Sequence, residues 1–126
     1  MDMDEKDLAR LLGVSRMAIG VTAFVAPKFT ARVWSGESPE MAVSHMAIRG
    51  LGVRDVAIGL GILIALENDK PVRGWLEASA LADAGDAAST LMSWKRWRSV
   101  RKVGALAIEL SAAYLGLQLA EALDPA

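Results

Sequence analysis

The sequence contains no cysteine, and its 126 residues include one histidine, one tyrosine and two phenylalanines. The absence of cysteine excludes disulfides, thiolate nucleophiles and thiolate metal ligands. Since there is no second histidine, neither a haem nor a zinc site is expected, and we assign no metal ligand. No motif in the sequence indicates which cofactor, if any, the protein binds.

The sequence also lacks a strong excess of charge of one sign. Fourteen basic and 15 acidic residues give a formal net charge of −1, so no overall field favours nucleic acid. Residues 95–102, KRWRSVRK, form a local basic cluster, which we interpret as a topology signal in contact with anionic lipid rather than a nucleic-acid site. The N-terminus, MDMDEKDLAR, is acidic where a secretory signal has a basic region, so no cleavable signal is expected.

The sequence is rich in apolar segments whose pattern is typical of helices. Hydrophobic residues make up 53% of the chain, glycine and proline fall where helices would begin, end or touch, and alternating strand patterns are missing. We therefore predict an all-α fold in a single domain, residues 1–126, with a short turn of helix in the first connector before Ser38 and Pro39. The four long helices are expected at about residues 8–26, 42–66, 72–94 and 100–123, packed as an antiparallel bundle.

The length of the uncharged runs leaves two settings open. The longest runs, residues 17–27, 56–66 and 110–120, have only 11 residues each, which is typical of core helices in soluble proteins. All four tryptophans, however, fall at helix ends, and basic residues gather in the first and third connectors. We therefore expect four transmembrane helices in a lipid bilayer, with connectors 1 and 3 cytoplasmic and the termini outside. A soluble four-helix bundle that dimerises through its apolar faces is the alternative.

Polar residues form a stripe on the third expected helix, in and around the stretch LADAGDAAST. Ser79, Asp83, Asp86, Thr90 and Ser93 share one helical face, which would face the bundle interior rather than lipid. Charged residues flanked by small residues on the other helices are the expected partners. The candidates for a ligand or proton site are Arg16, Arg54, Asp55, Asp83, Asp86, Thr90 and Glu109. No catalytic residue is assigned.

The charges in this set do not balance. Two arginines face four carboxylates, so a dry interior would need protons, a cation or water. One interpretation is an intramembrane cavity that binds a small ligand or moves protons. The other is a non-catalytic scaffold or accessory subunit, in which the buried charges fix helix assembly. Whether the protein is an enzyme stays open.

Three segments of the sequence resemble those of a known protein family. GVSRMAIGVTAFVAP, RGLGVRDVAIGLGILIAL and WLEASALADAGDAAST resemble an uncharacterised family of small four-helix bacterial membrane proteins that is DoxX-like in layout. The resemblance implies a four-span protein of the bacterial inner (plasma) membrane, of an auxiliary or redox-linked kind. It carries over no catalytic residue. Besides the bilayer, the expected partner is a second copy of the chain or another membrane protein.

Overall fold

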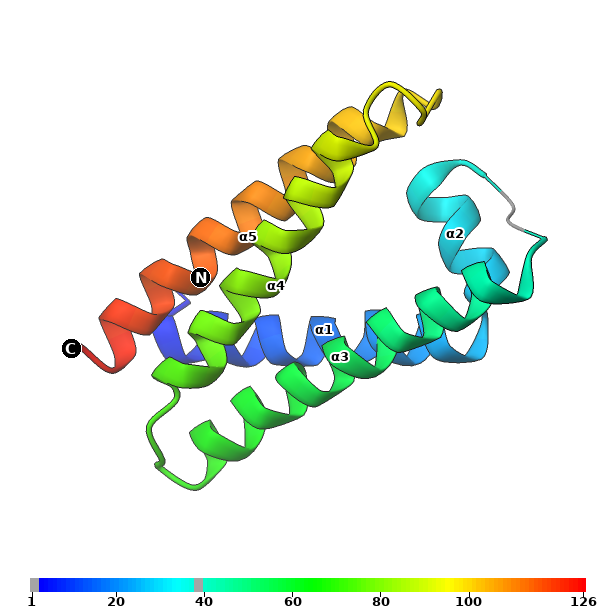
Figure 1. Cartoon of the computed structure of the whole chain (residues 1–126). Helices are drawn as coiled ribbons and strands as arrows, with labels where there is room; N and C mark the ends of the chain where they lie inside the picture. Colours follow the sequence, from blue (N-terminus) through cyan, green and yellow to red (C-terminus); the bar gives the residue numbers. More distant parts are fainter. Residues whose placement is uncertain (1–2, 38–39) are drawn as a thin grey trace.

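The computed structural model describes residues 3–37 and 40–126, and this part of the chain contains five helices and no strand (Figure 1). The all-α prediction is confirmed. The helices are α1 (Glu5–Val25), α2 (Pro27–Ser35), α3 (Ala42–Glu67), α4 (Arg73–Met92) and α5 (Arg101–Leu123). The ends of the four long helices differ from the expected ends by at most three residues. Ser38 and Pro39, expected to end the turn of helix in the first connector, lie outside the described residues.

Local chemistry explains where α1 and α2 begin and end. The Asp4 carboxylate caps the N-terminus of α1 by accepting a hydrogen bond from the backbone N–H of Asp7 at 2.7 Å. Pro27 ends α1 because it has no N–H to continue the hydrogen-bond ladder, and it suits the first turn of α2 for the same reason. Gly36 ends α2 with φ 76°, a left-handed conformation that favours glycine.

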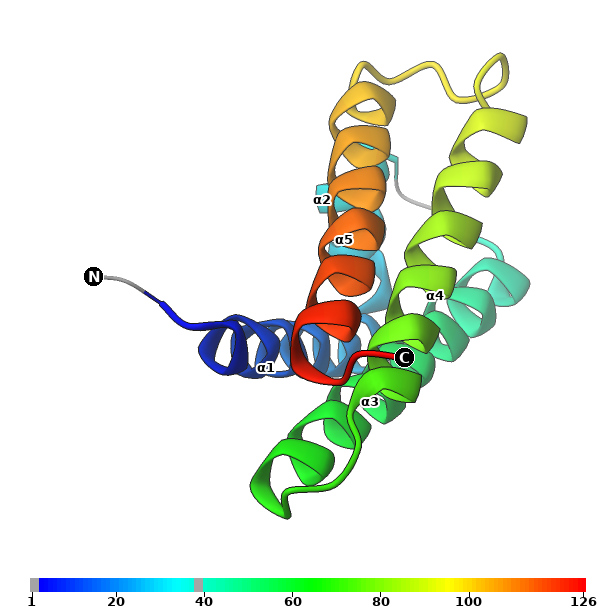
Figure 2. The same cartoon turned by 90° about the vertical axis from the view of Figure 1, so that its left-hand side faces the viewer.

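The long helices are arranged as two antiparallel pairs. α1 packs along α3 and α4 packs along α5, while contacts between the two pairs are fewer. Both termini and the α3–α4 connector lie towards one end of the molecule, and the pairs diverge towards the other end, where α2 lies (Figures 1 and 2). The two pairs therefore need a specific connection to stay together.

Glycines bring α1 and α3 into close contact at two levels. A Cβ on Gly59 would lie 2.5 Å from the carbonyl oxygen of Gly13, and one on Gly52 would lie 2.5 Å from that of Gly20. The two glycines on each helix are seven residues apart, so both contacts fall on the same face of each helix. Only glycine permits the two backbones to approach this closely.

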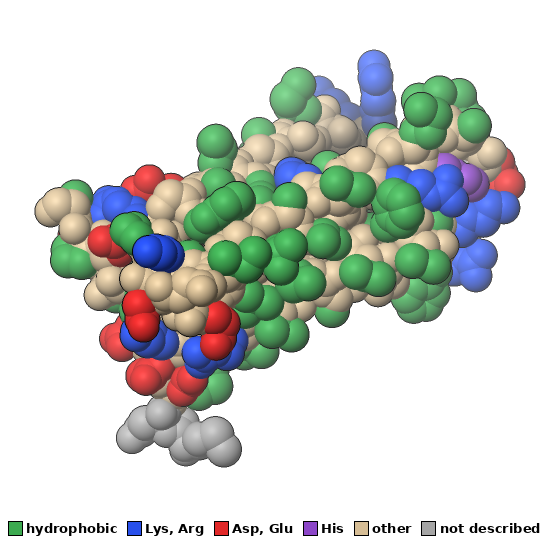
Figure 3. All heavy atoms as spheres, turned by 90° about the horizontal axis from the view of Figure 1, so that it is seen from below, with side chains coloured by type: hydrophobic (Ala, Val, Ile, Leu, Met, Phe, Trp, Pro, Cys, Tyr) green, Lys and Arg blue, Asp and Glu red, His purple; other side chains and the backbone are tan. Residues whose placement is uncertain are grey.

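The structure buries several charged side chains and leaves many large apolar side chains exposed, which is unusual for a soluble domain. Arg16, Asp83 and Glu109 are at most 8% exposed, whereas large apolar side chains such as Phe24 and Leu110 are more than half exposed. Figure 3 shows apolar side chains spread over the middle of one face, with charged residues gathered towards its ends. By length and composition, two helices of the described chain, α1 and α5, are long and apolar enough to cross a membrane.

A clamp holds α2 to the start of α5 at the end where the pairs diverge. Arg101 donates to the carbonyl oxygen of Arg32 at 3.0 Å and to that of Val33, and the Trp97 indole donates to the Ser35 carbonyl at 2.8 Å. These carbonyls belong to the last turn of α2, where the helix dipole favours a positive charge. The clamp thus ties α2 to the α4–α5 pair.

We predict that Gly52→Ala or Gly59→Ala lowers the free energy of unfolding by about 1–3 kcal/mol, because the new methyl group overlaps the facing backbone. The control is Gly85→Ala on α4, where a Cβ meets no atom within 4 Å. That change should stabilise the helix by about 0.5–1 kcal/mol. Unfolding of each purified variant measures both effects, and equal stabilities of Gly52→Ala and Gly85→Ala would contradict the close contact.

Candidate functional site

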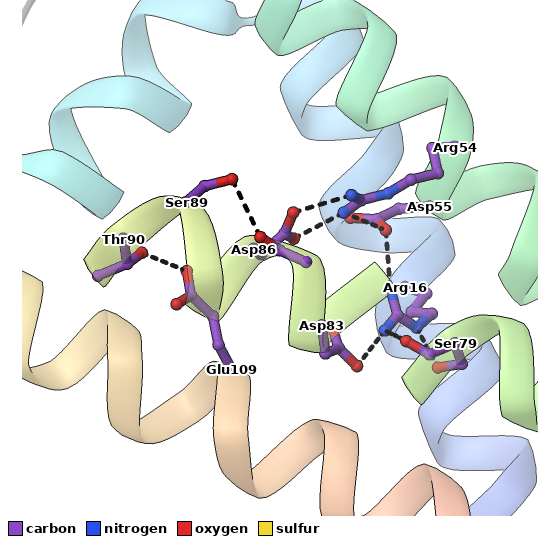
Figure 4. Close-up of polar contacts among 10 residues, drawn as sticks. Arg16, Arg54, Asp55, Ser79, Asp83, Asp86, Ser89, Thr90 and Glu109 are labelled. Carbon is purple, nitrogen blue, oxygen red and sulfur yellow. Dashed lines mark hydrogen bonds and ion pairs between the residues drawn. The ribbon is translucent and has the colours of Figure 1, made fainter. Parts of the chain in front are cut away.

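Arg16 lies at the centre of a buried network of charges (Figure 4). From α1, its Nη1 donates to Asp55 Oδ1 on α3 at 2.7 Å, and its Nη2 donates to Asp83 Oδ2 on α4. Its Nε donates to Ser79 Oγ at 2.7 Å, and Nη2 also donates to the Ser79 carbonyl at 3.1 Å. A guanidinium with five N–H donors suits this role because it holds several acceptors in a fixed geometry. One side chain therefore connects three helices and both helix pairs.

Arg54 forms the second centre of the network. Its Nη1 and Nη2 donate to the two carboxylate oxygens of Asp86 at 2.9 and 2.7 Å, a bidentate pair between α3 and α4. Its Nη2 also donates to Asp55 Oδ1 at 3.3 Å, the oxygen that accepts from Arg16. The Asp55 carboxylate thus links the two arginines.

The two centres differ in their exposure. The Arg16 side chain is 8% exposed, whereas the side chains of Arg54 and Asp86 are 30% and 31% exposed. Removing charges from water is costly, and the deeper centre recovers that cost only through its full set of hydrogen bonds. The Arg16 centre therefore has the geometry of a structural joint, and the Arg54–Asp86 pair is the accessible part of the network.

The helical positions explain how the network forms. Arg54 and Asp55 are adjacent and point about 100° apart, so Asp55 reaches α1 while Arg54 reaches α4. Asp83 and Asp86 lie one turn apart on α4, where each meets a different arginine.

The structure brings five of the seven candidate residues together and leaves two apart. Thr90 and Glu109 make a separate contact between α4 and α5, in which Thr90 Oγ1 donates to Glu109 Oε1 at 3.1 Å (Figure 4). Glu109 Oε2 is buried and has no hydrogen-bond partner within residues 3–37 and 40–126. Ser79 is the network member that was not among the candidates. Its signal was its position on the polar face of α4, one turn before Asp83.

The pairing leaves an excess of negative charge. Arg16 and Arg54 offset two of the three aspartates that they bind, and Glu109 makes no ion pair in the described part of the chain. With Glu109 ionised, the set has four negative and two positive charges. The excess is therefore concentrated on the α4 and α5 side.

Two surface hollows lie away from the network. One of about 320 Å³ is bordered by Lys6, Asp69 and Asp124, and another of about 240 Å³ is bordered by Val21 and Val53; no network residue lines either. Among the described residues, no group of three or more metal-ligating side chains is placed to hold a metal ion. The arginines and carboxylates of the site can therefore form ion pairs, and the carboxylates can accept protons.

Comparison of the chain with models of known protein families, with curated proteins and with solved structures found no match. The DoxX-like resemblance therefore stays a prediction, and the role of the site is argued from its geometry.

We predict that Arg16→Met lowers the free energy of unfolding by about 3–5 kcal/mol, because Asp55 and Asp83 would remain buried with less or no counter-charge. The control is Arg10→Met on the same helix, where an exposed arginine also pairs with two acids, Asp7 and Glu67. That change should cost only about 0–1 kcal/mol. Chemical unfolding of both variants measures the difference, and a loss of similar size at the two positions would argue against a central role for Arg16.

Proposed function

We propose that the chain is a small polytopic membrane protein that crosses the bilayer four times, and that its buried charges hold the two helix pairs together. The observation that carries this proposal is the combination of ion pairs buried inside and many large apolar residues exposed outside. A monomeric soluble domain rarely exposes apolar surface over several whole helices, whereas lipid requires it.

The lengths of the helices support this setting. α4, the shortest of the four long helices, has 20 residues and is about 30 Å long, the thickness of the hydrocarbon core of a bilayer. α1 and α5 are apolar enough to span by composition alone. Every 18-residue stretch of α3 or α4 carries at least three charged residues. Asp55 and Asp83, however, pair with Arg16 on the inside and do not face lipid.

The charges at the ends of the molecule support a sidedness. Lys28, Lys95 and Arg96 lie exposed at the end that holds α2 and the α4–α5 connector. By the positive-inside rule, we place this end in the cytoplasm and the termini outside, in a bacterial inner membrane. The number of spans, but not this orientation, is also what the DoxX-like resemblance implies.

The glycine contacts and the Arg16 hydrogen bonds hold different helices together. In lipid there is little hydrophobic force between helices, so association depends on close packing and polar contacts. The glycine contacts join α1 to α3, and the Arg16 centre joins that pair to α4. The protein is thus best described as a membrane scaffold or accessory subunit with an internal ionic joint, whose partner is a second copy or another membrane protein.

A second candidate function rests on the part of the polar interior that this joint does not use. Glu109 has no counter-charge among the described residues, and the Arg54–Asp86 pair is about one-third exposed. An unbalanced carboxyl and an accessible ion pair in the same polar interior favour binding of a small ligand or movement of protons.

The four-span proposal is tested by single cysteines, because the native chain has none. Glu37→Cys, Asn68→Cys and Ser93→Cys place one thiol at an exposed position near the first, second and third connectors. An impermeant maleimide added to intact cells should label only Asn68→Cys, and permeabilised cells should allow labelling of all three.

The control for this labelling is extraction of the membrane fraction with alkaline carbonate, in which the protein should remain with the lipid. Recovery of the protein in the soluble fraction, or labelling of all three cysteines from one side, would contradict the proposal. The reverse labelling pattern would keep four spans but overturn the orientation.

A further inference from the structure

Glu109 is a buried carboxyl whose hydrogen bonding is incomplete. The residue is 5% exposed, and its Oε1 accepts one hydrogen bond, from Thr90. Its Oε2 has no partner among the described residues. Such a group requires an explanation because a buried, unsatisfied charge is strongly destabilising.

Within the part of the chain that the structure describes, the surroundings of Glu109 supply no positive charge. The charged groups that act on it electrostatically are Asp83 and Asp86, both on the facing helix α4 and both acids. The two arginines nearest to these aspartates are already bound to them, with Asp86 holding both terminal nitrogens of Arg54.

The α5 face that carries Glu109 is otherwise built from small apolar residues. Ala105, one turn earlier, is 4% exposed, and a Cβ on Gly116 would lie 3.2 Å from Ala80 of α4. This face therefore packs closely against α4 at Gly116, and among the described residues it provides no counter-ion. An ionised carboxylate here would be uncompensated.

We propose that Glu109 binds an exchangeable proton on Oε2, at the contact between α4 and α5. On binding, an O–H bond of a hydronium ion from the solvent breaks and an O–H bond forms at Oε2, which converts the carboxylate to the neutral acid. On release, the proton returns to solvent water and the carboxylate reforms. Oε2 is the site because Oε1 already accepts the Thr90 hydroxyl proton. A metal ion is the weaker alternative, since the described residues contain no group of three or more side chains placed to hold one. This inference deepens the second candidate function by naming its ligand.

The test is infrared spectroscopy of the purified protein at neutral pH, in the region where a protonated carboxylic acid absorbs. The wild-type protein should show such a band, and it should shift on transfer to heavy water because the proton exchanges. Glu109→Gln should remove the band entirely and, being neutral and similar in shape, should still fold. The matched control is Glu121→Gln on the same helix, where an exposed carboxylate pairs with Arg73, and this variant should keep the band.

Thr90→Val provides an independent readout that leaves Glu109 in place. Loss of the Thr90 hydrogen bond should move the acid band to higher frequency without removing it. The proposal is overturned by absence of the band in the wild type, by its persistence in Glu109→Gln, or by its failure to shift in heavy water. Loss of the band in Asp83→Asn or Asp86→Asn, with retention in Glu109→Gln, would place the proton in the network instead. These spectra do not depend on how many times the chain crosses the membrane. A negative result would therefore overturn the proton proposal and leave the four-span proposal unaffected.

Discussion

A guanidinium in the interior of a small helical protein must find acceptors for its N–H groups, and this requirement governs how the helices meet. Arg16 satisfies it with the carboxylates of Asp55 and Asp83 and with both oxygens of Ser79. These groups come from α3 and α4, so the arginine is satisfied only when both helix pairs are in place. The same interaction that makes its burial tolerable therefore determines the position of one pair relative to the other.

The remaining contacts take on roles that follow from this constraint. Glycines allow α1 and α3 to approach so closely that the Arg16 and Asp55 side chains reach each other. The α2 clamp, through Arg101, restrains the end where the pairs diverge. The arginines and aspartates of the network lie inside while many large apolar side chains lie outside, which suits a lipid environment.

Much of the helical layout could be predicted from the sequence, because Pro27 and the charged connectors separate the apolar segments at the helix ends. The polar face of α4 was also predictable from helical spacing, and so was the divergence of Arg54 and Asp55 towards different neighbours. Which neighbours they meet was not predictable. That depends on α1 pairing with α3 around the short helix α2, a long-range choice that local spacing does not encode.

The division of the candidate set also lay beyond the sequence. Spacing placed Thr90 on the same stripe as Asp83, yet Thr90 contacts α5 and takes no part in the arginine network. Glu109 and the arginines are both flanked by small residues, so the pattern gave no reason to separate them. Which candidate residues contact one another depends on how far each side chain extends across the contact between two helices. This can be read only from the three-dimensional arrangement.

The central claim, that Arg16 and Asp83 join the two helix pairs directly, is tested most directly by a double-mutant cycle. The free energy of unfolding would be measured for the wild type, Arg16→Met, Asp83→Asn and the double variant. A direct contact predicts that the double variant loses less than the sum of the single losses, by about 0.5–3 kcal/mol. Additive losses would contradict the account, because they would mean that the two side chains do not interact.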